Sequence, residues 1–260
     1  MPVNKSSFNV KLHIEKQGQG QPFILLHGWG FNYAVWQSIV PELAQQYCVY
    51  QVDLPGHGKS EMCDYDLPVL LNVLADQLPK HAIWLGWSLG GLLAMAMARW
   101  QPDYVDKLIV VAGSPCFVAK SDWQHATQLN ILNQFIEQLQ KDVVGTLKRF
   151  LALQTRGSDT AQQQLRQLRQ LLTVNHLPHH DALQAGLHLL LHTDLRPELT
   201  HIQCPSLLIL GEKDRLVPAK MEQDCQQYWQ NLNVAVIPQA AHIPFLSHPV
   251  AFLKVVQCFI

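Results

Sequence analysis

The sequence predicts an α/β fold in which helices flank a mainly parallel sheet. Short apolar runs of strand type alternate along the chain with segments whose residues favour helices. Several of these runs end in Gly-rich or Pro-rich turns, as at residues 27–30 and 53–60. A chain of 260 residues is long enough for one such domain with an insertion.

The first part of the chain begins this alternation. Residues 8–14 alternate between apolar and polar side chains, which is typical of a half-exposed edge strand. Residues 22–26 are almost wholly apolar, which indicates an interior strand. In chain order we expect strands over residues 8–14, 22–26, 48–52, 83–86 and 107–112, and helices over residues 33–46 and 67–78.

The alternation stops after the fifth expected strand. Residues 121–192 contain no strand-like run, and leucines such as Leu165 and Leu168 recur at helical spacing. This segment is too long for a plain connection, so we expect a helical cap, or lid, over the strand ends. Strands and helices then alternate again over residues 206–210, 218–229, 234–237 and 248–259. The expected division is a core over residues 1–120 and 193–260, with a cap over residues 121–192.

Composition excludes several classes of protein. The 19 Lys and Arg residues nearly balance the 20 Asp and Glu residues, so no general attraction to nucleic acid or to an anionic membrane is expected. Residues 1–20 lack the apolar core of a secretory signal, and the longest apolar stretch, residues 82–98, is broken by Ser88 and by glycines. We therefore expect a cytoplasmic protein. The six cysteines are scattered without metal-binding spacing, which argues against a metal site.

The predicted chemistry centres on one serine. Residues 82–85 form a short apolar run, the motif G-W-S-L-G follows at residues 86–90, and good helix formers come next. A G-x-S-x-G motif between a strand and a helix is a nucleophile elbow, whose tight turn lifts the serine hydroxyl clear of the backbone. Ser88 is therefore the candidate nucleophile. The alternative is a serine in an ordinary Gly-rich turn.

Two further residues complete a candidate catalytic set. A serine nucleophile needs a base beside it and a carboxylate that orients the base. Asp214 and His242 each follow a predicted strand, where an open α/β sheet places its ligand sites. The chain order Ser88, Asp214, His242 is that of the α/β hydrolases. Alternatively, Asp214 caps a helix or pairs with Arg215, and His242 is a structural histidine.

Other histidines and one aspartate receive structural roles. His27 opens the loop at residues 27–30 and suits a loop-bracing hydrogen bond better than the role of base. His57 lies in a turn far from the expected base, and Asp53 fixes that turn. His248 begins the last helix.

A serine that attacks a carbonyl carbon forms a tetrahedral intermediate, and the negatively charged oxygen of this intermediate, the oxyanion, needs hydrogen-bond donors. The backbone N–H of Leu89 supplies one, and that of Trp29 in the loop at residues 27–30 supplies the other. The large side chain of Trp29 adds an apolar wall above the nucleophile. Alternatively, it serves only to pack the loop.

The predicted cap carries a group of cations. The segment from Lys148 to Arg169 contains five Lys or Arg residues and one acidic residue, Asp159. Arg166 and Arg169 are spaced to share one helix face. In a chain of nearly zero net charge, this cluster suits an acidic partner. A solvated helix face explains it equally well.

Six segments of the chain carry a resemblance to one family. They are 26–30 (LHGWG), 52–56 (VDLPG), 82–91 (AIWLGWSLGG), 114–117 (SPCF), 149–155 (RFLALQT) and 240–245 (AAHIPF). The elbow motif and the order of the catalytic residues are shared by the whole α/β-hydrolase superfamily, whereas the sequences at 84–91 and 149–155 are specific to far fewer of its members. Over nearly its whole length, the chain resembles the pimeloyl-[acyl-carrier protein] methyl ester esterases of biotin synthesis, which are α/β hydrolases.

The resemblance implies a reaction and a set of site residues. The reaction is hydrolysis of the methyl ester of pimeloyl-carrier protein to pimeloyl-carrier protein and methanol, with no metal or organic cofactor. The family's catalytic residues map onto Ser88, Asp214 and His242, and its oxyanion donors onto Trp29 and Leu89. Its substrate-binding positions map onto Trp29, Ser88, Leu89, Phe150, Leu151, Ala152, Leu153, Gln154 and His242.

The resemblance also implies that cap cations hold the acidic carrier protein. Arg149, Arg166 and Arg169 stand where such residues are expected. Gly145 and Gln162 stand where arginine is expected, which predicts weaker or different docking. We expect a monomer that binds neither nucleic acid nor membranes.

Two other functions remain compatible with the sequence. One is a different small-ester or C–C bond hydrolase, because the fold does not determine the substrate. The other is a non-catalytic module that binds a carrier protein, against which the complete Ser, His and Asp set argues.

Overall fold

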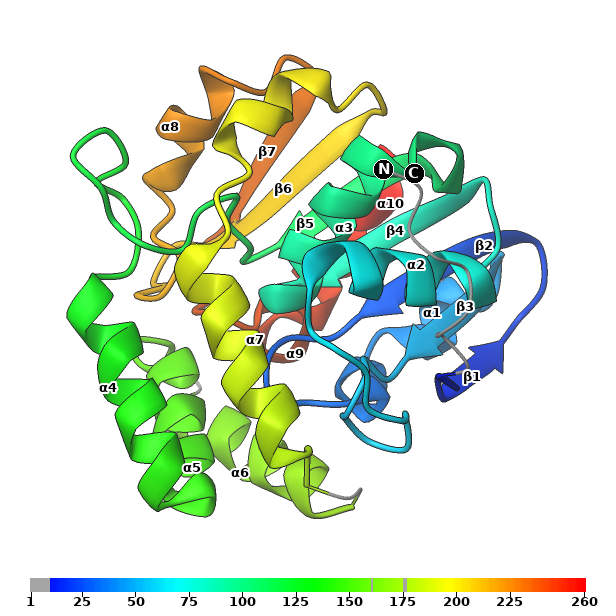
Figure 1. Cartoon of the computed structure of the whole chain (residues 1–260). Helices are drawn as coiled ribbons and strands as arrows, with labels where there is room; N and C mark the ends of the chain where they lie inside the picture. Colours follow the sequence, from blue (N-terminus) through cyan, green and yellow to red (C-terminus); the bar gives the residue numbers. More distant parts are fainter. Residues whose placement is uncertain (1–9, 160, 175–176) are drawn as a thin grey trace.

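The computed structural model describes residues 10–159, 161–174 and 177–260 (Figure 1). In these residues, seven strands form one sheet in the order β1, β3, β2, β4, β5, β6, β7. β1 is antiparallel to β3 and all other neighbouring pairs are parallel, so the predicted mainly parallel sheet is confirmed. The strands are β1 (Ile14–Gln17), β2 (Gln21–Leu26), β3 (Tyr47–Val52), β4 (Ala82–Trp87), β5 (Val105–Val111), β6 (Ser206–Gly211) and β7 (Leu232–Ile237).

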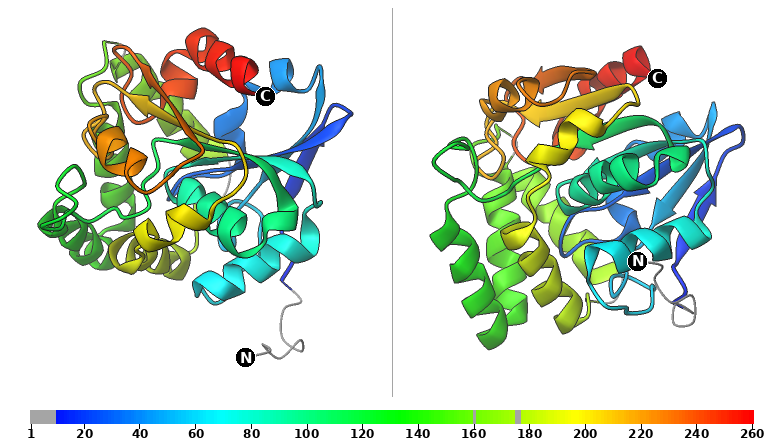
Figure 2. Two further views of the ribbon diagram at one scale, coloured as in Figure 1. Left: turned by 90° about the horizontal axis from the view of Figure 1, so that it is seen from above. Right: turned by 45° about the horizontal axis from the view of Figure 1, so that its top comes forward.

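Two apolar clusters lie on the two faces of the sheet. Side chains alternate along a strand, so in β2 Phe23 and Leu25 join one cluster, whereas Ile24 and Leu26 join the other. Helices α2 (Leu67–Gln77) and α3 (Leu89–Trp100) cover the face of Ile24, and α10 (Pro249–Phe259) covers the face of Phe23 (Figure 2). Both faces of β2 are therefore buried, which explains its continuous apolar run.

The edge strand lies later in the chain than the sequence predicts. Residues 8 and 9 are outside the described residues, and β1 covers only Ile14–Gln17. The backbone N–H groups of residues 11–13 donate instead to the side chains of Glu61, Gln77 and Ser60. An alternating pattern alone does not show which backbone groups have strand partners.

The helix expected over residues 33–46 is broken into two pieces. A 3-10 helix spans Tyr33–Trp36, and α1 spans Val40–Leu43. Pro41 lies in the first turn of α1, where its missing N–H is tolerated, whereas it cannot continue a helix that started earlier. Two other short helices are α8 (Met221–Gln226), which is shorter than expected, and α9 (Pro244–Ser247), which precedes α10.

Between β5 and β6 the chain forms a layer of helices, which we call the cap helices. They are α4 (Leu129–Lys141), α5 (Val143–Thr155), α6 (Ala161–Val174) and α7 (His180–His192), and they lie together on one side of the molecule (Figure 1). The helical character of this segment is as predicted, while its status as a separate domain stays a prediction. No helix of the described residues is long and apolar enough to cross a membrane.

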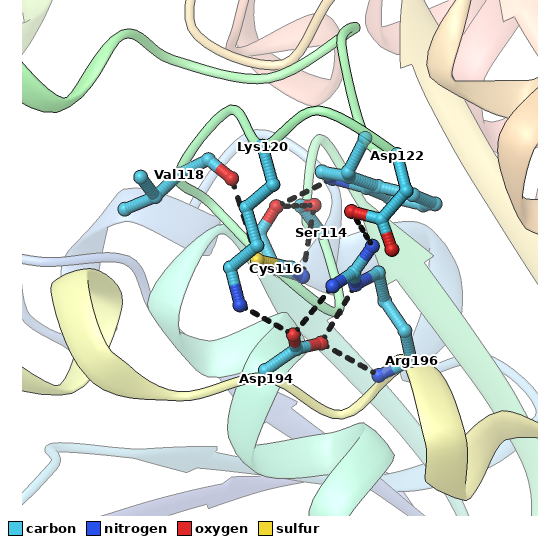
Figure 3. A network of polar contacts seen from close by, with 8 residues as sticks. Ser114, Cys116, Val118, Lys120, Asp122, Asp194 and Arg196 are labelled. Atoms are coloured by element: carbon cyan, nitrogen blue, oxygen red, sulfur yellow. Dashed lines mark hydrogen bonds and ion pairs between the residues drawn. The ribbon is translucent and has the colours of Figure 1, made fainter.

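The chain segments that enter and leave the cap are tied together at a neck, formed by residues 114–123 and 194–196 (Figure 3). The Asp194 carboxylate accepts from Lys120 Nζ at 2.6 Å and from Nε and Nη2 of Arg196, each at 2.8 Å. Nη1 of Arg196 also lies 3.0 Å from Oδ1 of Asp122. Burial opposes ionisation of Asp194, but the hydrogen bonds from Arg196 and Lys120 outweigh it and hold the pKa of this carboxyl well below its usual value.

Candidate active site

Ser88 occupies the sharp turn between β4 and α3. Its backbone has φ 54° and ψ −114°, a left-handed conformation that costs a non-glycine residue about 1–3 kcal/mol. A Cβ atom on Gly86 would overlap the Gly90 carbonyl oxygen, and one on Gly90 would overlap the Leu26 carbonyl oxygen. The glycines of the motif therefore allow β4, the turn and α3 to pack this closely. The predicted order of strand, turn and helix is present.

Asp214 and His242, which are 28 residues apart in the chain, meet in the interior. Nδ1 of His242 lies 2.7 Å from Oδ2 of Asp214, and the two residues are 1% and 6% exposed. Oδ1 of Asp214 accepts from the backbone N–H groups of Leu216 at 2.8 Å and Val217 at 3.0 Å. Asp214 thus caps its own turn and orients the imidazole at once. No ion pair joins it to Arg215 within the described residues.

The second ring nitrogen of His242 is available for proton transfer. Nε2 is buried and has no hydrogen-bond partner among the described residues. Because Nδ1 is the nitrogen that faces the carboxylate, it carries the hydrogen, and Nε2 is the basic atom of the neutral ring. This is the arrangement that a general base for a serine hydroxyl requires.

The loop that carries His242 is fixed from both sides. Trp87 Nε1 donates to the backbone oxygen of His242 at 2.8 Å, and the backbone N–H of His242 donates to the backbone oxygen of Gln154 at 3.1 Å. Trp87 immediately precedes Ser88 in the chain, so the residue that fixes the His242 loop is the neighbour of the nucleophile. Sequence reasoning missed Trp87. The only available signal was a large aromatic residue inside a Gly-rich turn.

Two backbone N–H groups, those of Trp29 and Leu89, donate no hydrogen bond within the described residues, and both residues are fully buried. Their side chains lie close together, since a Cβ atom on Gly186 would be 2.8 Å from Trp29 Cδ1 and 3.4 Å from Leu89 Cδ2. Unpaired buried N–H groups are rare in proteins, and a pair of them is what an oxyanion hole needs.

The loop of Trp29 is held against the turn after β3 by two buried histidines. Leu54 N donates to Nε2 of His27 at 2.9 Å, and Gly30 N donates to Nε2 of His57 at 3.4 Å. Burial lowers the pKa of His57 to about 4 and that of His27 well below its ordinary value. Both rings act as hydrogen-bonding braces, as predicted for His27.

Two other polar residues also have the structural roles that the sequence predicts. Asp53 accepts from the backbone N–H groups of Tyr33 at 2.7 Å and Lys59 at 2.9 Å, and so fixes the Pro/Gly turn. His248 is the residue immediately before α10. Neither is placed to act as the base.

Comparisons with known proteins give the family of this chain. The model of the "Alpha/beta hydrolase family" matches residues 23–255. A relative named pimeloyl-[acyl-carrier protein] methyl ester esterase, from Pectobacterium carotovorum subsp. carotovorum (strain PC1), is 43% identical over 250 residues, which cover 95% of this chain and 98% of the relative. A relative of the same name from Aeromonas hydrophila subsp. hydrophila is 41% identical over 96% of this chain and 100% of its own length. The chain belongs to the alpha/beta hydrolase family, together with these esterases.

Solved alpha/beta hydrolases confirm the fold. An esterase from Exiguobacterium antarcticum superposes with a TM-score of 0.86 at 23% identity, covering 96% of this chain and 95% of that one. An enol-lactonase from Burkholderia xenovorans LB400 gives 0.83 at 20% identity, covering 97% of each chain. At this identity the likeness concerns the architecture alone.

In this alpha/beta hydrolase the α5 segment expected to line the substrate site is split between two faces of the helix. Phe150, Leu151 and Gln154 are buried, Leu153 is half-buried and Ala152 is exposed. The Phe150 ring lies 4.8 Å from the Trp29 ring, and Oε1 of Gln154 is buried without a partner among the described residues. The structure does not bring Ala152 to the site, because a residue two positions from Phe150 points to the opposite side of a helix.

The expected carrier-docking arginines lie on the outside of the cap helices. Arg149, Arg166 and Arg169 are all exposed. Gly145 lies in the first turn of α5, where its N–H donates to Oδ1 of the capping Asp142 at 2.8 Å and where a Cβ atom would overlap that carboxylate. The glycine that replaces the expected arginine is thus part of a helix cap.

Proposed function

We propose that this chain hydrolyses the methyl ester of pimeloyl-[acyl-carrier protein], a step of biotin synthesis. The observation that carries the proposal is the likeness, over nearly the full length of both chains, to relatives with that name at 43% and 41% identity. The hydrogen-bonded pair of His242 and Asp214, next to an elbow that carries Ser88, supports it with the chemistry that an ester hydrolase needs.

In the proposed mechanism Ser88 forms an ester with the substrate. Its Oγ attacks the carbonyl carbon of the methyl ester while Nε2 of His242 takes the hydroxyl proton. Asp214 stabilises the resulting imidazolium through Nδ1. The oxyanion accepts hydrogen bonds from the backbone N–H groups of Trp29 and Leu89. As the intermediate collapses, His242 gives its proton to the methoxy oxygen and methanol leaves.

Water then releases the product by the same route. Nε2 of His242 takes a proton from water, whose oxygen attacks the acyl carbon of the acyl-enzyme. The second tetrahedral intermediate collapses, the bond to Ser88 Oγ breaks, and His242 returns the proton to that oxygen. The product is the carboxylic acid, which stays attached to the carrier protein at its other end.

The cap would hold the rest of the substrate. Phe150, Leu151, Leu153 and Gln154 would line the path of the acyl chain. The acidic carrier protein would dock on Arg149, Arg166 and Arg169, whose exposure leaves them accessible. A cytoplasmic location and a monomeric state belong to the same proposal.

Two substrates test the proposed function. The purified protein should hydrolyse both a soluble p-nitrophenyl ester and methyl pimeloyl-carrier protein, and it should restore growth to a biotin auxotroph that lacks this esterase. Activity on the small ester alone would indicate a different hydrolase on the same scaffold. Activity on neither, with carrier protein still bound, would indicate a binding module.

A further inference from the structure

His27 is held through both of its ring nitrogens. The residue follows β2 and is fully buried. Nε2 accepts the backbone N–H of Leu54 at 2.9 Å, so the ring hydrogen must be on Nδ1. Nδ1 lies 2.8 Å from the carbonyl oxygen of Gly28 and donates to it. The turn after β3 thereby fixes the ring, and the ring fixes the Gly28 carbonyl group.

The Gly28 carbonyl and the Trp29 N–H belong to a single peptide unit. A trans peptide unit is planar, and its C=O and N–H bonds point in opposite directions. A ring that holds the Gly28 oxygen therefore also sets the direction of the Trp29 N–H. We propose that His27 is a positioning residue that aims the Trp29 N–H at the oxyanion of the reacting ester. This inference rests on the proposed function.

The peptide unit between Gly28 and Trp29 needs such a restraint because two residues of the loop are glycines. Gly28 and Gly30 lie on either side of Trp29, and Gly30 has φ 78°. Glycine allows wide backbone rotation, so the peptide between Gly28 and Trp29 is intrinsically free to tilt. The turn hydrogen bond from Phe31 N to Gly28 O is 3.3 Å long, against 2.8 Å for the bond from His27. The shorter bond is the stronger restraint.

Burial preserves this arrangement. A protonated ring would place an N–H on Nε2 against the N–H of Leu54, which would remove the bond that anchors the ring. Burial and the neighbouring His57 both lower the pKa of His27, so the neutral form that makes both hydrogen bonds is favoured.

Two substitutions separate the two hydrogen bonds. In His27→Asn the side-chain amide nitrogen can reach the Gly28 oxygen as Nδ1 does, but the acceptor for Leu54 is lost. In His27→Gln the side-chain oxygen can still accept from Leu54, but the donor to Gly28 is lost. Both variants remove a buried imidazole, so we expect similar losses of thermal stability.

The kinetic expectation differs between the two variants. On a p-nitrophenyl ester, His27→Gln should lose roughly 10- to 100-fold in kcat at unchanged KM, less than the 10²- to 10³-fold that follows complete loss of an oxyanion donor. His27→Asn should stay within about threefold of wild type in kcat, because its side-chain amide retains a donor to the Gly28 oxygen. The control Trp84→Phe removes a buried ring donor that does not belong to this loop, since Trp84 Nε1 donates to the Tyr104 backbone oxygen at 2.9 Å. It should lower Tm with little change in kcat.

Several results would overturn the proposal. They are equal kcat values for His27→Asn and His27→Gln, or kcat losses that follow Tm across all three variants. If His27→Gln does not fold, ¹⁵N NMR of the wild-type imidazoles decides, since a neutral His27 with its hydrogen on Nε2 contradicts the geometry. The proposed function is checked separately with Ser88→Ala: an inactive Ser88→Ala beside a fully active His27→Gln would refute the positioning role alone.

Discussion

The indole Nε1 of Trp29 donates to the backbone oxygen of Leu183, 2.7 Å away inside α7. Trp29 thereby joins the proposed oxyanion loop to the cap helices. The loop of His242 contacts the cap in the same manner, through the 3.1 Å hydrogen bond to the backbone oxygen of Gln154 in α5. The two loops that flank Ser88 therefore both depend on the position of the cap.

Removing the indole donor should lower activity on every substrate. Trp29→Phe keeps an aromatic ring against Phe150 but leaves the Leu183 oxygen without this donor, which should cost about 0.5–1.5 kcal/mol of stability and reduce kcat. Trp84→Phe is the matched control, since Trp84 is equally buried and its Nε1 donates to the Tyr104 backbone oxygen at 2.9 Å. It should lose similar stability in urea unfolding and keep its kcat. Equal kcat for the two variants would argue against coupling between cap and loop.

Ser88 should show a trade of stability for function. Ser88→Ala should lose nearly all esterase activity, to a level on the order of 10³–10⁴ over water that binding and the oxyanion hole supply. Ser88→Gly should be as inactive but more stable than Ser88→Ala, by about 1 kcal/mol, because glycine adopts φ 54° without strain. Calorimetry and an ester assay measure both. A Ser88→Ala variant with a tenth of wild-type kcat would exclude Ser88 as nucleophile.

The two buried histidines should make the protein sensitive to mild acid. Burial places the pKa of His57 at about 4 and that of His27 well below the unfolded value near 6.5. The unfolded chain therefore binds protons first, and stability that is complete above about pH 6.5 is lost as the pH falls towards 4. Between pH 6 and pH 5 each ring should contribute up to about 1.4 kcal/mol per pH unit. Urea unfolding of wild type and His57→Gln should show a shallower pH slope in the variant.

Reversing charge on α6 should affect only the carrier-bound ester. The double change Arg166→Glu and Arg169→Glu should leave hydrolysis of a short soluble ester nearly unchanged and lower kcat/KM for the carrier-bound ester. The wild-type rate on the carrier-bound ester should also fall with salt, since exposed charges are screened over about 8 Å at physiological ionic strength. Arg149 adjoins the buried Phe150, so its substitution could also disturb the acyl site and should be tested apart from the α6 pair.

A control with the same change in net charge isolates the effect of location. Lys220→Glu with Lys254→Glu alters two exposed cations outside the cap. This variant should keep wild-type kcat/KM on both esters. Equal losses of kcat/KM on both esters in the α6 variant would show that its arginines are structural. A loss on the carrier-bound ester in the control as large as that in the α6 variant would show that net charge, and not the location of the arginines, determines docking.

The neck should contribute more stability than a surface ion pair. Asp194→Asn removes the charge that Lys120 and Arg196 share, and hydrogen bonds to charged groups contribute about 1.5–3 kcal/mol. Asp103→Asn is the control, because the Lys80–Asp103 pair is 53% and 72% exposed and should contribute less than about 1 kcal/mol. Comparable Tm shifts in the two variants would show that the neck is no stronger than the surface pair.

The features predicted from the sequence were those set by local chemistry. The strand, turn and helix around Ser88 could be predicted from glycines at fixed positions. Asp214 and His242 could be predicted as candidates because each lies directly after a predicted strand. The bonds from Trp29 to Leu183 and from His242 to Gln154 span 154 and 88 residues and have no local pattern. The break near Pro41 has a local signal, the proline itself, which the prediction of one helix over residues 33–46 did not use.

The neck also has an evolutionary consequence. Leu195 N donates to the Pro115 backbone oxygen at 2.8 Å, so the chain leaves the sheet after β5 and returns before β6 at nearly the same place. A segment whose ends already meet can grow, shrink or be exchanged without altering the order or register of the strands. Selection on the residues between these ends can therefore change which molecules reach the serine while the sheet that holds it stays the same.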